Sequence, residues 1–181
     1  GVPNNALVPG AAPSVLAALE AALSVLAARG ATVVRLALPL MEAVSAYGGV
    51  VSRVEGATIH AKWMRARPQD YAVHLSGRMY PGYAIPGVYY AEALGRRGAI
   101  LKAFAAEVFE QVDLIATPTI PTVLPTLAET DIDAAEAAGD PAETIARFLA
   151  VSVNTRPFNY LGLPAVSAPC GLDANGLPVG L

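Results

Sequence analysis

The sequence has few of the residues on which metal and redox sites depend: one cysteine and two histidines in 181 residues. A single cysteine excludes a disulfide framework and any metal site built from cysteines alone. His60 and His74 are too far apart to share a helical turn, and neither has a carboxylate beside it at ligand spacing. We therefore expect no metal ion and no other cofactor.

Charge and long apolar runs are also scarce. Charged residues make up 15% of the chain and the net charge is −3, which argues against nucleic-acid binding because that function normally needs a basic face. The longest apolar run, Ser14 to Ala28, is interrupted by Glu20 and is too short to span a bilayer. It also lacks the charged leader of a signal peptide, so we expect a cytoplasmic protein without a membrane partner.

The chain lacks the common nucleophile motifs as well. None of its serines lies in a Gly-x-Ser-x-Gly or Ser-x-x-Lys motif. Lys62 and Lys102 lie on predicted helix faces, where surface lysines are the usual interpretation, and Cys170 has no histidine beside it. The residues alone therefore identify no catalytic machinery.

What is present is a pattern of helices and strands typical of an α/β protein. A hydrophobic content of 54% indicates a folded core. Pro13 and Gly30 are typical of a helix start and a helix end, which predicts a helix over 13–29. A strand follows over 31–38, and residues 1–3 would be the end of a parallel strand before the helix.

The remaining elements follow from the same rules. We expect helices over 41–62, 89–112 and 140–153, the last one starting with Asp140 as its cap, and short strands over 113–116, 165–168 and 177–181. Residues 65–86 hold many prolines and glycines, which favours short helical turns and loop. Residues 130–139 are acidic and alanine-rich, typical of an exposed turn of helix or loop.

The most informative loop begins at Thr117. The run Thr117-Pro118-Thr119-Ile120-Pro121-Thr122 directly follows the predicted buried strand 113–116. Its prolines cannot continue a ladder, so it must form an ordered loop at the carboxyl end of that strand. Open α/β sheets bind their ligands at such ends, so the loop is a candidate binding segment.

Three segments of the chain resemble the amidase signature family. They are D-L-I-A-T-P-T-I-P at 113–121, P-F-N-Y-L-G-L-P-A-V-S-A-P-C-G at 157–171 and G-L-P-V-G-L at 176–181. Weaker matches precede these segments and follow the family's order: Val2-Pro3, Gly30-Ala31, Leu38-Pro39, Glu55, Tyr89-Tyr90 and Arg97. The resemblance covers essentially the whole chain.

The resemblance implies an α/β/α sandwich with a mixed central sheet flanked by helices, and hydrolysis of a carboxamide C–N bond. Members of the family use a serine nucleophile, a second serine with a cis peptide and a lysine base, all near a Gly/Ser-rich signature. No Gly-Ser run occurs in this sequence. We therefore assign no catalytic residue and interpret residues 1–181 as the C-terminal portion of an amidase domain, truncated at both ends and inactive by itself.

The resemblance also suggests which residues contact a small amide substrate. Thr117, Pro118, Thr119 and Ile120 would form part of the pocket wall, although the two threonines could equally cap the end of a strand. Tyr89 and Arg97 are candidate pocket-edge groups, and an aromatic residue on such a helix is more often part of the core. Asn159 is a further candidate, with a structural role favoured.

Partners and alternatives follow from the same interpretation. The missing N-terminal half of the enzyme would cover a sheet face and edge, and without it we expect a homo-oligomer. The alternatives are a non-catalytic α/β binding or assembly module and a fragment of the glutamyl-tRNA amidotransferase A protein. We rank the latter below a small-amide hydrolase because the negative net charge does not favour tRNA contact.

Overall fold

The computed structural model describes residues 1–139 and 141–181, and of Val73 the backbone alone. The chain begins with the parallel unit expected from the sequence: strand β1 (Val2–Pro3), helix α1 (Pro13–Ala28) and strand β2 (Arg35–Leu36). Val2 pairs with Arg35 and Pro3 with Leu36. The helix starts at Pro13 as predicted, and Gly30 turns the chain with a φ of 99°.

The second strand is shorter than the predicted range 31–38. Only Arg35 and Leu36 have strand geometry, because β1 offers a ladder of two residues. Val33, which precedes them, is exposed. A β-branched sequence by itself does not make a strand where no neighbouring chain supplies hydrogen bonds.

An extended segment joins the two pairs of strands into one hydrogen-bonded series. The backbone N–H of Ala116 donates to the Gly1 carbonyl at 2.7 Å, and that of Thr119 donates to the Gly180 carbonyl at 2.8 Å. Gly180 belongs to β4 (Pro178–Gly180), which runs antiparallel to β3 (Pro169–Leu172). The order across the molecule is β2, β1, residues 114–119, β4 and β3, so parallel and antiparallel neighbours occur together.

Two predicted strands need correction. Residues 113–116 are extended but have no strand assignment, and Leu114 is 76% exposed, so they are not a buried strand. The predicted strand 165–168 is also wrong, because the ladder with β4 starts at Pro169. The prediction over 177–181 agrees with β4 to within a residue or two at each end.

The main core lies between long helices on one side of this series. It involves α2 (Met41–Ala66), α4 (Gly87–Phe109) and the short α7 (Arg156–Leu161). Val44, Phe104, Val108 and Leu161 are fully buried there, and the Tyr160 hydroxyl donates to the Ala93 carbonyl at 2.6 Å. Burial of this apolar surface is the main source of stability for these helices.

The proline-rich stretch 65–86 is more helical than its sequence predicts. It contains a 3-10 turn over Pro68–Asp70 and the helix α3 (Val73–Ala84), with Pro81 inside the helix. Gly82 brings α3 so close to α2 that a Cβ atom there would collide with the Arg53 carbonyl. Packing against α2 therefore outweighs the local cost of the proline.

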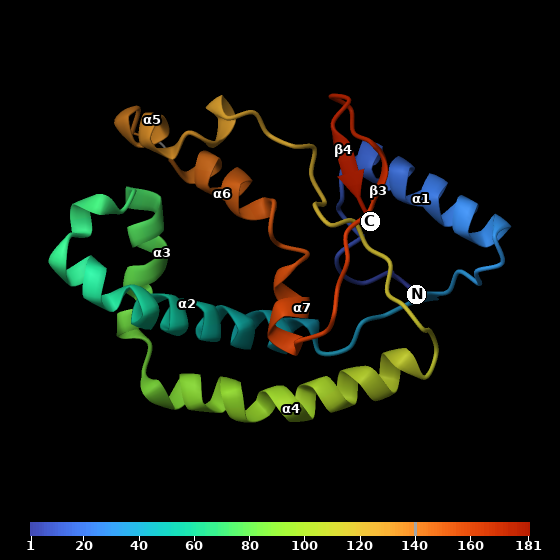
Figure 1. Cartoon of the computed structure of the whole chain (residues 1–181), viewed down its shortest axis with the longest axis horizontal. Helices are drawn as coiled ribbons and strands as arrows, with labels where there is room; N and C mark the ends of the chain where they lie inside the picture. Colours follow the sequence, from blue (N-terminus) through green and yellow to red (C-terminus); the bar gives the residue numbers. More distant parts are fainter. Residues whose placement is uncertain (140) are drawn as a thin grey trace.

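Between residues 114–119 and α7, the chain forms short helices: a 3-10 turn at Ala128–Thr130, α5 (Ile132–Ala137) and α6 (Ala142–Ala150). This agrees with the expected exposed turn and following helix, although the predicted cap Asp140 lies outside the described residues. In Figure 1, α5 and α6 lie at the opposite side of α2 from α4. No helix in the described part of the chain combines the length and the apolarity needed to cross a bilayer.

Candidate functional site

The three sequence segments that carry the family resemblance meet around the Thr117–Ile120 segment. Pro118 is fully buried. The Thr119 hydroxyl lies 2.7 Å from the Ser167 hydroxyl, and its backbone N–H donates to Gly180. Ala168 exchanges two backbone hydrogen bonds with Leu181 at 2.9 and 3.0 Å. Residues more than 40 positions apart in sequence are thus joined by hydrogen bonds at one place.

A cavity of about 300 Å³ opens at this meeting point. Thr119, Ile120 and Ser167 line it, together with Val15 of α1 and Val179 and Gly180 of β4. A Cβ atom on Gly180 would lie 2.6 Å from the Ser167 hydroxyl oxygen, so only glycine leaves room for the hydroxyl pair. The lining combines apolar side chains with a few polar groups, as small-molecule sites do.

Asp173 fixes the outer wall of this cavity. One of its carboxylate oxygens accepts hydrogen bonds from the backbone N–H groups of Asn175 and Leu177, and the other accepts one from Leu124. These backbone hydrogen bonds, with that from Leu177 foremost, hold the pKa of Asp173 below its usual value despite the opposing effect of burial. The carboxylate therefore joins the β3–β4 turn to the backbone at Leu124.

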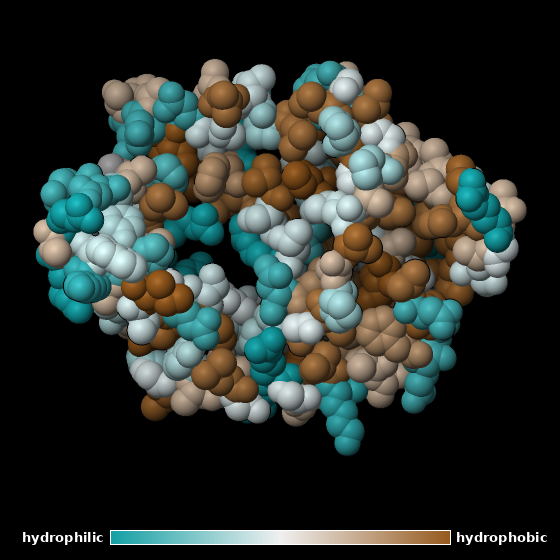
Figure 2. All heavy atoms as spheres, in the orientation of Figure 1, coloured by the Kyte–Doolittle hydropathy of each residue, from teal (hydrophilic) through white to brown (hydrophobic). Residues whose placement is uncertain are grey.

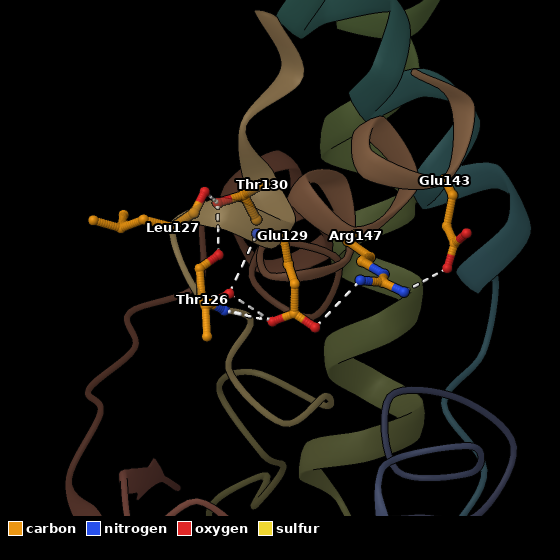
Figure 3. Close-up of polar contacts among 6 residues, drawn as sticks. All are labelled: Thr126, Leu127, Glu129, Thr130, Glu143 and Arg147. Carbon is orange, nitrogen blue, oxygen red and sulfur yellow. Dashed lines mark hydrogen bonds and ion pairs between the residues drawn. The ribbon is translucent and has the colours of Figure 1, made fainter. Parts of the chain in front are cut away.

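A second cavity, of about 240 Å³, shares Thr122 and Leu124 with the first and includes Glu129 and Arg147 in its lining. Figure 3 shows that Arg147 lies between two carboxylates, with Glu129 on one side and Glu143 on the other. Glu129 also accepts hydrogen bonds from the backbone N–H and the hydroxyl of Thr126. These two bonds, and then the charge of Arg147, lower the pKa of Glu129.

The structure distributes the other residues predicted from sequence differently. Thr119 and Ile120 line the larger cavity, whereas Thr117 and Pro118 lie behind them. Neither of the two cavities is lined by Tyr89, Arg97 or Asn159. Tyr89 and Asn159 are exposed, and the Arg97 guanidinium packs against Gly162, which has a φ of 74°. Their contact with substrate stays a prediction.

Sequence reasoning missed Ser167 and Asp173 in the lining of the larger cavity, and it also missed Asn154. The side-chain nitrogen of Asn154 donates to the carbonyls of Leu7 and Pro118. One signal was available: Asn154 ends a mostly apolar run, A-R-F-L-A-V-S-V-N, in which an amide side chain needs a buried partner.

Three arginines, Arg53 on α2, Arg78 on α3 and Arg156 at the start of α7, are linked by their charges. Arg156 donates from one guanidinium nitrogen to the Leu149 carbonyl and the Ser152 hydroxyl, each at 2.8 Å. Burial lowers the pKa of Arg156, and the positive charges of Arg78 on α3 and Arg53 on α2 lower it further. None of these three arginines forms an ion pair with a carboxylate among the described residues.

The helices that bear these arginines border an opening in the molecule. Figure 2 shows that the face is hollowed where α2, α3, α6 and α7 surround this opening, with hydrophilic side chains around its rim. On α3, the ring of His74 packs edge-on against Phe148 of α6, and its buried Nδ1 has no hydrogen-bond partner among the described residues. The described residues contain no group of His, Cys, Asp and Glu side chains able to hold a metal ion.

Comparison with known proteins defines the class to which this fold and site belong. The model of the amidase family matches residues 1–181, so the chain belongs to the amidase family. The family inferred from the motifs is confirmed.

Individual relatives agree with this assignment. The chain is 37% identical over 196 residues to the A component of the glutamyl-tRNA(Gln) amidotransferase of Thermosynechococcus vestitus, a match that covers 95% of this chain and 38% of that protein. A solved amidase is 25% identical, with a TM-score of 0.68 over 92% of this chain and 36% of its own. The 6-aminohexanoate cyclic dimer hydrolase, at 21% identity, shares the fold, with a TM-score of 0.69 over 99% of this chain and 39% of its own. The predicted α/β fold is thus confirmed, and the chain spans less than two-fifths of the length of each of these three proteins.

Proposed function

We propose that this chain is part of an amidase that hydrolyses the C–N bond of a small carboxamide. The observation that carries the proposal is the convergence of the three family segments on one cavity, through the Thr119–Ser167 and Thr119–Gly180 hydrogen bonds. A family match over all 181 residues supports it.

The family resemblance implies how the chemistry would be divided. A serine nucleophile, a second serine with a cis peptide and a lysine base would come from a region that precedes these segments in the family. The residues present here would build the scaffold and part of the substrate pocket. Thr119 and Ser167 can donate to and accept from a carboxamide, while Pro118 and Pro121 keep the loop rigid.

We further propose that the substrate carries an anionic group such as a carboxylate. Besides burial, the positive charges of Arg78 and Arg53 lower the pKa of Arg156, and none of the three arginines forms an ion pair with a described carboxylate. Like charges held together repel one another, and a bound anion relieves that repulsion. A guanidinium group is well suited to this task because it binds a carboxylate through two parallel hydrogen bonds.

The test is an ammonia-release assay on the full-length enzyme with paired substrates. Succinamate and butyramide differ in one carboxylate, and we expect kcat/KM to be on the order of tenfold or more higher for succinamate. An R156M variant should lose that preference and retain its turnover of butyramide. Equal rates for the two amides would refute the anionic substrate, whereas no hydrolysis of any amide would refute the amidase itself in favour of a non-catalytic module. The 181-residue polypeptide alone should release no ammonia.

A second candidate function is that of the A component of an amidotransferase. It is favoured by the curated relatives, because those from Thermosynechococcus vestitus and Moorella thermoacetica are both named as this component of glutamyl-tRNA(Gln) amidotransferase. Hydrolysis by the full-length chain alone separates the two functions, because a transferase component should need its partner chains and a charged tRNA to turn over efficiently. Dependence of ammonia release on those additions would favour the second candidate.

A further inference from the structure

The side chain of Asn154 joins three parts of the chain that are distant in sequence. It lies in the turn between α6 and α7 and is only 3% exposed. Its amide nitrogen donates to the Leu7 carbonyl at 2.8 Å and to the Pro118 carbonyl at 2.7 Å. The Thr117 hydroxyl lies 3.4 Å from the same nitrogen.

These bonds use both hydrogens of the amide group. A side-chain –NH2 has two donors, and here each has a carbonyl acceptor. Aspartate has the same shape but no donor, and its charge would face two carbonyl oxygens. A leucine of similar size would leave the Leu7 carbonyl without this donor and the Pro118 carbonyl with the Thr117 hydroxyl, at 3.3 Å, as its remaining side-chain donor. An unsatisfied buried polar group is costly.

The hydrogen bond from Asn154 to the Pro118 carbonyl fixes the position of the Thr117–Ile120 segment. Proline has no backbone N–H, so its carbonyl is the one backbone group of that residue able to form a hydrogen bond. The next residue, Thr119, donates its own N–H to Gly180 and directs its hydroxyl to Ser167 in the larger cavity. The segment is therefore fixed by Asn154 on one side and by β4 on the other.

We propose that Asn154 is a positioning residue that holds the Thr117–Ile120 segment so that Thr119 faces the substrate cavity. Asn154 itself lines neither of the two cavities, so we expect it to act through the segment and not by touching the substrate. The inference deepens the proposed amidase function and rests on it where catalysis is concerned. The effect on the segment itself can be measured without any activity.

The first experiment measures hydrogen exchange in the full-length protein. In N154D, the Thr119 amide should lose protection by on the order of tenfold or more, because its bond to Gly180 depends on a fixed segment. The matched control is N159D, which changes the same residue type at an exposed position nearby and should leave that amide unchanged. If N154D fails to fold, N154S offers a milder loss of the donors. Unchanged protection of Thr119 in a folded Asn154 variant would overturn the proposal.

The second experiment separates positioning from simple stability. At a temperature where each variant is fully folded, N154D should raise KM or lower kcat by on the order of 10–100-fold, as small displacements of site residues do. In a T119V background the same substitution should have a much smaller effect, because both changes disrupt one contact. Additive effects would overturn the proposal. If the wild type hydrolyses no amide, the proposed function fails and the hydrogen-exchange result alone decides the role of Asn154.

Discussion

Asp173 illustrates how one side chain shapes the candidate site. Its carboxylate accepts three backbone N–H groups, from Leu124, Asn175 and Leu177, and thereby joins the extended loop to the β3–β4 turn. The same bonds lower its pKa because they favour the ionised form. A side chain whose pKa is lowered on folding stabilises the fold at every pH above its unfolded pKa of about 3.9.

We therefore predict a pH-dependent effect of the D173N substitution. At pH 7 the variant should unfold at a lower temperature than the wild type, because the amide has one acceptor oxygen instead of two. The difference should shrink as the pH falls below about 4 and through the lowered pKa of the folded protein, because the wild-type carboxylate is then protonated. Thermal unfolding from pH 7 to pH 3 measures this, with D133N on the exposed part of α5 as the control. A constant gap across that range would contradict the role assigned to the charge.

At the scale of elements, the contact between α2 and α3 depends on one glycine. A Cβ atom at Gly82 would collide with the Arg53 carbonyl and lie 2.8 Å from the Cβ of Ala57. Backbone atoms of a helix cannot move aside as a flexible side chain can. Arg53 on α2 and Arg78 on α3, two members of the proposed anion site, both lower the pKa of Arg156.

The G82A substitution should lower the free energy of unfolding by about 1–3 kcal/mol, as other overpacked contacts do. The control is G77A in the same helix, where a Cβ atom meets nothing within 4 Å. This control should be neutral or raise stability by up to about 1 kcal/mol, because alanine favours the helix over glycine. Urea unfolding of both variants provides the comparison, and a G82A variant as stable as G77A would show that the helices can separate at little cost.

At the scale of the whole molecule, exposed apolar side chains lie next to the edge of β3. Val166, just before β3, is 89% exposed, and Leu172 at the end of β3 is 62% exposed. Among the described strands, β3 pairs with β4 alone. An unpaired strand edge next to exposed apolar side chains tends to associate with another chain. We propose that the remaining part of the enzyme covers this surface.

We accordingly expect the 181-residue polypeptide, expressed by itself, to self-associate. Light scattering over a concentration series should give a mass above that of one chain. The double substitution V166K and L172K should shift the mass toward the monomer, because charges at a strand edge oppose pairing. The control is L127K, which removes a leucine that is 92% exposed in a different region, the turn before Ala128–Thr130. A monomer at high concentration in the unsubstituted polypeptide would refute this expectation.

The local features of the fold were predictable from short stretches of sequence. Pro13 and Gly30 bound α1 because proline suits a first helical turn and glycine accepts a positive φ. The family segments at 113–121, 157–171 and 176–181 identified the family and the loop that lines the cavity. The same local reasoning failed for 65–86, where Pro81 argued against a helix that packing on α2 maintains.

The sequence determined the family, the α/β class and the ends of the first helix, because these depend on backbone preferences and motifs within a few residues. It also predicted that the Thr117–Ile120 segment is an ordered loop. Which side chains meet at that segment became known only from the folded structure. Ser167 comes from 48 residues away to pair with Thr119, and Asn154 reaches across 147 residues to Leu7. Such contacts depend on how separate elements pack against one another, and no local preference of the chain encodes them.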